Sequence, residues 1–327
     1  MSGRTQTTLW IGALAAAILA GIGAAQAQDY PTRPVKLVVP FGPGGPTDVA
    51  ARLVSQIAQS ELGATIVVEN RPGAGGATGS KSVANAEPDG YTLLVGTSAT
   101  LAVVPALMKN PGYDPLKSFA AVAKVADSTT VMIVPANFPA NSIKEFVAYA
   151  KANPGRLSYA SAGAGNQTQL AAELLKARAG IEAIHVPYKS GAEMVTAVLS
   201  EQVQFTFPDI SILIPLIRDH KVKALAVTSA RRHPQLPDVP TLLESGIPDF
   251  AITFWSGVVA PAGTPAAIVS KLNAAMDKGL RSQDIRDKLA AIGAQTTPGS
   301  PQDFASFIAS ETVKWREIAK TANVSLD

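Results

Sequence analysis

Two glycine-rich segments of the sequence carry residue types that can bind an anion. They are Phe41–Asp48, with the sequence FGPGGPTD, and Ser161–Thr168, with the sequence SAGAGNQT. Each follows a short apolar run and precedes a helical pattern, which predicts a turn from a strand into a helix. Glycine lets the backbone approach a ligand closely, and the first N–H groups of a helix lack partners within the helix. Two such turns facing each other would hold a carboxylate without an arginine.

A purely structural interpretation of the same two turns is also open. Thr47 or Asp48 in the first turn, and Asn166 in the second, are residue types that cap the N-termini of helices. The segments would then be ordinary strand-to-helix connections. Spacing alone does not decide between the two interpretations.

A third glycine-rich segment, Gly73–Ser82, has features of a phosphate-binding loop but not its spacing. That loop needs glycine directly before lysine, and here Ser80 stands between Gly79 and Lys81. The dinucleotide pattern G-x-G-x-x-G also fails, because Thr78 occupies the position of its last glycine. We interpret the segment as a turn that positions the following helix.

Composition argues against catalysis and against a metal centre. The sequence has no G-x-S-x-G elbow, and none of its three histidines stands at a recognisable spacing from a serine. It has no cysteine, which excludes disulfides and thiolate metal sites. The formal net charge is +3, and the sequence predicts no basic face suited to nucleic acid. We expect a protein that is no enzyme and needs no metal or cofactor.

The first 27 residues have the features of a secretory signal peptide. Arg4 is their one charged residue, Leu9–Ala24 is apolar, and Ala25-Gln26-Ala27 matches a signal-peptidase site. A membrane anchor is the alternative, since the apolar run is close to the shortest length that spans a bilayer. The cleavage pattern favours export, so we expect residues 1–27 to be removed and the mature chain to be periplasmic.

The remaining sequence alternates short apolar runs with helical patterns, which predicts an α/β fold. The predicted strands are Val35–Phe41, Thr65–Glu69, Tyr91–Thr97, Leu157–Ser161, Ile184–Tyr188, Gln204–Phe207 and Ala224–Thr228. Helices are predicted at Asp48–Leu62, from Ser142, from about Asn166 to Arg178, after each of the last three strands, and from Pro265 and Pro301. Two stretches, near Val122–Thr130 and Pro248–Trp255, look like crossings between two lobes.

Six sequence blocks in this order make the chain resemble a known family. It is similar to the extracytoplasmic solute receptors of tripartite tricarboxylate transporters, the Bordetella uptake gene (Bug) family. The blocks are Val39–Arg52, Val68–Gly76, Pro88–Leu94, His185–Lys189, Pro237–Thr241 and Ala260–Pro265.

This resemblance implies a two-lobe, Venus-flytrap fold of the type II-like periplasmic binding protein kind, in which each lobe is a mixed sheet flanked by helices. Lobe 1 would comprise residues 28–127 and 252–327, and lobe 2 residues 128–251. The chain would act as a monomer.

The resemblance also implies that a ligand carboxylate lies between the two turns, held largely by backbone N–H groups and bridging waters. The implied ligand-binding residues are Phe41, Gly44, Gly45, Thr47, Asp48, Thr97 and Ser98 on lobe 1, and Ser161, Gly163, Gly165, Asn166, Thr168, Tyr188, Phe207 and Asp209 on lobe 2. Asp209 is equally interpreted as a helix cap. The sequence departs from the family pattern at Pro46, Asn166, Gln169 and Val104–Met108, which affects ligand identity more than fold.

The predicted function is capture of a small carboxylate, such as an amino acid, a dicarboxylate or an aromatic acid, for a tripartite tricarboxylate-type transporter. A component that presents its ligand to a membrane histidine kinase would bind in the same way, so the sequence does not separate these two partners. A periplasmic hydrolase is the third possibility, and the missing nucleophile elbow argues against it.

Overall fold

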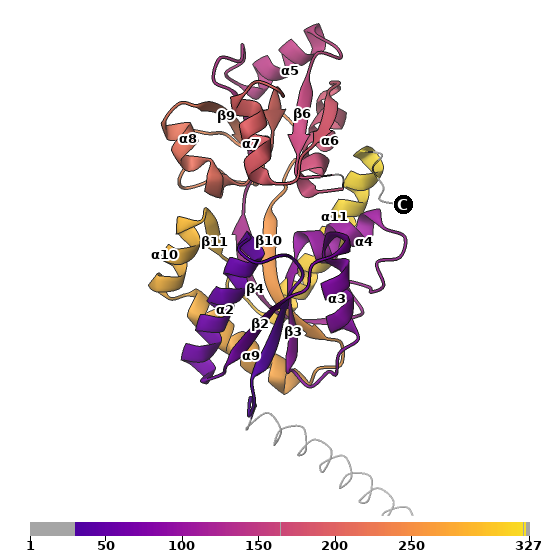
Figure 1. The fold of residues 1–327 in the computed structure, drawn as a ribbon, viewed down its shortest axis with the longest axis vertical. Coiled ribbons are helices and arrows are strands. Elements are labelled where there is room, and N and C mark those ends of the chain that lie inside the picture. The colour runs from indigo at the N-terminus through magenta and orange to yellow at the C-terminus, as the bar shows by residue number, and fades with distance from the viewer. Residues whose placement is uncertain (1–29, 164, 323, 325–327) are drawn as a thin grey trace, which may run out of the picture.

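The computed structural model describes residues 30–163, 165–322 and 324, which form two lobes stacked along the long axis of the molecule (Figure 1). The predicted signal peptide lies outside the described residues. Within them, no helix is both long enough and apolar enough to cross a membrane.

Lobe 1 is built on a six-stranded mixed sheet with the order β11-β4-β10-β3-β1-β2. Strands β1, β2 and β3 are parallel, whereas β10 runs antiparallel to β3 and β4, and β11 antiparallel to β4. The strands are β1 Val35–Val39, β2 Ile66–Asn70, β3 Thr92–Thr97, β4 Phe119–Ser128, β10 Phe254–Pro261 and β11 Ala294–Thr296.

Lobe 2 has a five-stranded mixed sheet with the order β7-β6-β8-β5-β9. Strand β6 is parallel to β7 and β8, and β5 is antiparallel to β8 and β9. The strands are β5 Val131–Pro135, β6 Ser158–Ser161, β7 Ile184–Pro187, β8 Phe205–Thr206 and β9 Val222–Val227. The two-lobe α/β architecture predicted from the sequence is therefore confirmed.

Helices cover both sheets and bury the apolar sides of their strands. The helices around lobe 1 are α2 Pro46–Leu62, η1 Ala74–Gly76, α3 Ala77–Ala84, η2 Ala99–Val103, α4 Val104–Leu107, α9 Ala266–Leu280, α10 Gln283–Ala291 and α11 Pro301–Ala322. Those around lobe 2 are α5 Ile143–Ala152, α6 Gln167–Ala179, α7 Gly191–Leu199, η3 Ile210–Ile212 and α8 Ile214–Arg218. One core cluster lies within lobe 1 and one within lobe 2, but the largest joins α11 of lobe 1 to α6 of lobe 2. The lobes thus share part of their core.

The predicted strands lie within two residues of the observed ones, and three differences between prediction and structure are informative. Strand β1 ends at Val39 because Pro40 has no N–H for the ladder. Helix α2 begins at Pro46 instead of Asp48, so Thr47 and Asp48 belong to its first turn. The helix expected after β9 is a wrong prediction: residues 228–253 run through turns, because Pro234, Pro237 and Pro240 interrupt that stretch.

The chain crosses between the sheets twice, between Ser128 and Val131 and again between Val227 and Phe254. Three buried threonines join the two crossings. The N–H of Thr228 donates to the carbonyl of Thr130 at 3.0 Å, and their hydroxyls lie 2.9 Å apart. The hydroxyl of Thr129 lies 3.3 Å from that of Thr228. The crossings therefore form one hydrogen-bonded hinge.

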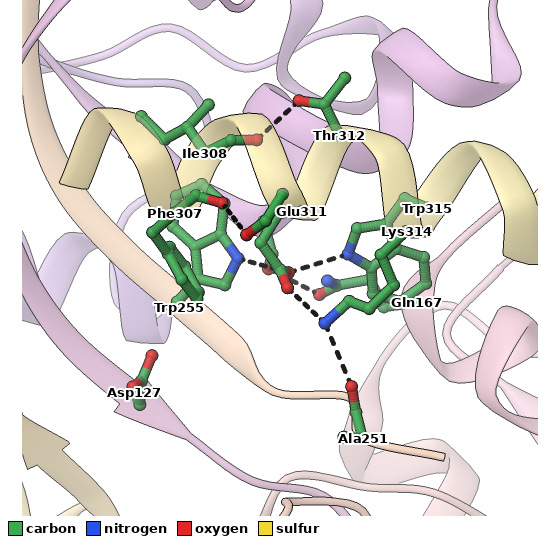
Figure 2. A network of polar contacts seen from close by, with 12 residues as sticks. Asp127, Gln167, Ala251, Trp255, Phe307, Ile308, Glu311, Thr312, Lys314 and Trp315 are labelled. Atoms are coloured by element: carbon green, nitrogen blue, oxygen red, sulfur yellow. Dashed lines mark hydrogen bonds and ion pairs between the residues drawn. The ribbon is translucent and has the colours of Figure 1, made fainter. Parts of the chain in front are cut away.

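Helix α11 adds a buried charged contact beside this hinge (Figure 2). Oε2 of Glu311 accepts hydrogen bonds from Nε1 of Trp255 on β10 at 2.9 Å and from Nε1 of Trp315 at 3.1 Å. Its Oε1 pairs with Lys314, which also donates to the carbonyl of Ala251 in the second crossing at 3.1 Å. Glu311 is 3% exposed, so its two bonds from the indoles are shielded from water, whereas the Lys314 side chain is about a third exposed. The carboxylate fixes α11 to the hinge.

Glu311→Ala should lower the free energy of unfolding by about 3 kcal/mol, because it leaves two indole N–H groups and one ammonium without their buried acceptor. The measurement is urea denaturation followed by circular dichroism. Glu317→Ala is the control, since Glu317 is exposed on the same helix and its loss should change stability by less than about 0.5 kcal/mol. Equal effects of the two substitutions would contradict an anchoring role for Glu311.

Candidate ligand-binding site

The turn between β1 and α2 is closed by the carboxylate of Asp48. Its Oδ2 accepts from the backbone N–H of Gly44 at 3.1 Å and from Nε of Arg52 at 3.0 Å. Gly44 has φ +82°, which glycine adopts without strain. Asp48 is 2% exposed, so its side chain holds the turn and is not presented to solvent.

Asn70, at the end of the neighbouring strand β2, ties the turn to the sheet. Its Nδ2 donates to the carbonyl of Phe41 at 3.0 Å and to Oδ1 of Asp48 at 3.1 Å. Gly76 packs closely against the same turn, since a Cβ added there would lie 2.5 Å from Thr100 and 3.2 Å from the ring of Phe41. The glycine-rich segment after β2 therefore packs under Phe41, and neither Asn70 nor Gly76 was identified as a site residue from the sequence.

The first turn of α2 has open backbone donors. Its N-cap is Gly45 in extended conformation, which has no side chain to cap the helix, and Pro46 follows at the first helical position. Among the described residues, the N–H groups of Thr47 and Asp48 have no acceptor. A Cβ added at Gly45 would meet no atom within 4 Å, so the turn borders open space. This helix start is suited to bind an anion.

The turn between β6 and α6 is different, because its own side chains use its donors. Asn166 is the N-cap of α6, and its Oδ1 accepts from the N–H of Thr168 at 3.0 Å. The N–H of Gly165 donates to Oε1 of Gln169 at 2.7 Å, and the N–H of Ala162 donates to Oγ1 of Thr168 at 2.9 Å. The cap predicted at Asn166 is present. Among the described residues, the donors of this turn left without a partner are Nδ2 of Asn166, the backbone N–H of Gln167 and the buried Nε2 of Gln167.

Ser98 and Gln167 bring the two lobes into contact at this level. Ser98 follows β3, which runs parallel to β1, so both strands end at the same edge of lobe 1. Oγ of Ser98 donates to Oε1 of Gln167, the first residue of α6, at 3.0 Å, and both side chains are buried. The ends of β1 and β6 therefore lie on the facing sides of the lobes (Figure 1).

The remaining predicted residues differ in how accessible they are. Tyr188 is half-buried after β7, whereas Phe207 is fully buried and stacks on Phe250 within the shared core. Thr97 hydrogen-bonds Thr100 at the start of η2. Phe207 and Thr97 thus lie behind the surface of the turns.

Asp209 lies at the hinge. Its Oδ1 caps η3 by accepting from the N–H of Ser211 at 2.9 Å, and Ser128 donates to its Oδ2 at 2.5 Å. This is the helix-cap role that the sequence left open for Asp209.

Two small cavities lie away from the turns. One of about 140 Å³ lies at the hinge, between Asp127, Arg231 and His233. The other, about 330 Å³, lies between Lys124 and the start of α11. Neither is lined by a residue of the two glycine-rich turns.

Comparison with known proteins identifies relatives over nearly the whole chain. The family described as tripartite tricarboxylate transporter family receptor matches residues 50–324. The protein BugT of Bordetella pertussis is 35% identical over 309 residues, which is 94% of this chain and 95% of BugT.

Two solved structures carry ligands in their descriptions. The R. palustris protein Rpa4515 with adipate is 36% identical, with a TM-score of 0.80 over 91% of this chain and 99% of that one. MatC of Rhodopseudomonas palustris with bound malate is 35% identical, with a TM-score of 0.76 over 88% of this chain and 99% of that one.

Asp48→Asn should make stability less dependent on pH. The pKa of Asp48 is lowered from 3.8, first by the N–H of Gly44 and then by Asn70 and Arg52. A lowered folded pKa gives stability that is complete well above pH 3.8 and is lost as the pH falls through the folded pKa. The variant should melt a few degrees below wild type at pH 7, and the gap should narrow at pH 3. Thermal melts at both pH values measure this, and a gap of constant size would contradict it.

Proposed function

Because the chain belongs to the tripartite tricarboxylate transporter receptor family, we propose that it is a periplasmic receptor that captures a small dicarboxylate and delivers it to the membrane subunits of such a transporter. Its homologues are solute-binding receptors and not enzymes. The dicarboxylate is inferred from two relatives, one solved with adipate and one with malate.

The open N-terminus of α2 is the observation that carries this proposal. One ligand carboxylate would accept from the N–H groups of Thr47 and Asp48, and Thr47 itself is half-buried. Asp48 and Arg52 form an ion pair at this turn, so their charges largely cancel. The positive end of the helix dipole is then the field that favours an anion.

Lobe 2 would bind the far end of the ligand with fewer donors. Nδ2 of Asn166 and the N–H of Gln167 are available, whereas Gly165 and Thr168 already bond within their own turn. We assign Ser161, Gly163, Gly165 and Thr168 to shaping this turn. The half-buried rings of Phe41 and Tyr188 would contact the carbon chain.

Capture follows from lobe closure. A ligand that contacts both helix starts binds the closed arrangement better than the open one, so it shifts the population towards closure. The Ser98–Gln167 bond joins the lobes in this structure. The transporter would then distinguish loaded from empty receptor by the relative position of the lobes.

A thermal-shift screen of residues 28–327 against aliphatic dicarboxylates, monocarboxylates, amino acids and aromatic acids tests the function. A ligand at 100 times its Kd adds about 2.7 kcal/mol of stability, enough to raise Tm by a few degrees. We expect shifts with aliphatic dicarboxylates such as adipate or malate, and calorimetry should show saturable binding without consumption. Stabilisation by none of these acids, in protein unfolded and refolded to remove any retained ligand, would contradict the proposal.

Gly45→Asp should stabilise the protein and weaken dicarboxylate binding. The new carboxylate would cap α2 and accept from the N–H groups that the ligand needs, adding about 0.5–1 kcal/mol of stability. The extended conformation of Gly45 (φ −82°, ψ 172°) suits any residue, and the added Cβ meets no atom within 4 Å. Tm of the free protein and Kd by calorimetry are the two readouts.

Gly45→Ala is the matched control, because it adds the same Cβ without an acceptor. It should keep Kd within a few-fold of wild type, whereas Gly45→Asp should raise Kd at least a hundredfold. Retained affinity in Gly45→Asp would exclude the α2 N-terminus as the carboxylate site, even if the protein binds a dicarboxylate elsewhere.

A further inference from the structure

Ser161 and His185 form a half-buried polar contact behind the lobe-2 turn. They lie on the parallel neighbours β6 and β7, in which Tyr159 pairs with His185 and Ser161 with Pro187. The imidazole stacks on the Tyr159 ring with centroids 5.0 Å apart and planes at 18°. Its Nε2 lies 2.5 Å from Oγ of Ser161, which is fully buried.

The Ser161 hydroxyl holds both polar groups of one backbone residue in the turn. It donates to the carbonyl of Gly163 at 3.0 Å and accepts from the N–H of Gly163 at 3.2 Å. Gly163 has φ +112°, a conformation that side-chain-bearing residues rarely adopt. The hydroxyl thus holds Gly163 in a backbone conformation for which the chain has little intrinsic preference.

The hydrogen-bonding capacity of a hydroxyl assigns the proton of His185. A hydroxyl donates once and accepts twice. Its donor is used on the Gly163 carbonyl and one lone pair on the Gly163 N–H, so the remaining lone pair faces His185. We therefore place the hydrogen on Nε2 of the imidazole; in the other tautomer the hydroxyl would donate to Nε2 and release the Gly163 carbonyl.

We propose that His185 is a positioning residue for ligand binding, whose Nε2–H orients the Ser161 hydroxyl and, through it, the backbone of Gly163. This inference rests on the proposed carboxylate site, because the turn it fixes is the one that presents Asn166 to the ligand.

The charged groups around His185 are compatible with a neutral imidazole. Burial lowers its pKa, the Glu173 carboxylate opposes this, and the Lys176 ammonium adds to it. Glu173 is itself paired with Lys176 at 2.8 Å and accepts from the Tyr159 hydroxyl at 2.5 Å. Burial, the largest of these effects, favours the neutral ring, which has a single N–H.

A packing role for His185 predicts different behaviour from a positioning role. Phenylalanine keeps an aromatic ring against Tyr159 but cannot donate, whereas glutamine keeps an N–H donor at a similar reach but loses the ring. His185→Phe and His185→Gln therefore separate stacking from hydrogen bonding.

The first readout needs no ligand: amide hydrogen exchange of Gly163 by NMR in the free protein. His185→Phe should speed exchange about tenfold, and His185→Gln should restore most of the protection. In a Ser161→Ala background, His185→Phe should have no further effect, because the hydroxyl it orients is absent. Unchanged Gly163 exchange in His185→Phe, additive effects of the two substitutions, or failure of glutamine to restore protection would each overturn the proposal.

The second readout is Kd for the tightest-binding acid of the screen, which should rise about tenfold in His185→Phe and less in His185→Gln. An unchanged Kd together with faster exchange would overturn the role of His185 in binding. If wild type binds no carboxylate, the proposed function fails, while the exchange experiment still decides whether His185 orients the turn.

Discussion

The start of α2, with its open N–H groups, is the constraint around which lobe 1 is arranged. Unpaired N–H groups next to solvent cost little free energy, because water can accept their hydrogen bonds. A turn that leaves these groups open must, however, keep its conformation without a capping side chain. Asp48 supplies the missing restraint by reaching back to Gly44, and Asn70 fastens both Phe41 and Asp48 to β2. Two separate sequence segments, one around Gly44 and one from Asn70 to Gly76, therefore serve one local conformation.

The helix N-termini of the two lobes are capped differently. Residues at the third helical position reach back to a preceding N–H in α2, α5, α6 and α7, through Asp48, Glu145, Gln169 and Glu193. In α5, α6 and α7 a serine or asparagine completes the cap, whereas α2 has Gly45 in that place. The asymmetry gives lobe 1 the helix start with open donors, which is the reason we propose it as the anion site and propose that side chains of lobe 2 discriminate between ligands.

Local patterns in the sequence predicted the α/β class, the strands β1–β3 and β6–β9 and the two turns, because strand alternation, glycine and capping residues act over a few positions. They did not predict β4, β5, β10 and β11, and the two-lobe arrangement was implied by the family resemblance. They identified Asn166 as a cap but could not show that Gly45 leaves α2 uncapped, since Thr47 and Asp48 were equally good candidates. Contacts between distant positions were beyond such patterns. Ser98 with Gln167, Ser161 with His185, and Trp255 with Glu311 are brought together only by the packing of whole strands and helices.

The buried carboxylate of Glu311 has an optical consequence. The sequence contains three tryptophans, and Trp10 belongs to the predicted signal peptide. The other two, Trp255 and Trp315, both donate to one oxygen of Glu311 beside the hinge (Figure 2). Indole emission responds to the charge and hydrogen bonding around the ring, so the tryptophan fluorescence of residues 28–327 originates at the junction of the lobes. Movement of one lobe against the other can therefore be followed in the unlabelled protein.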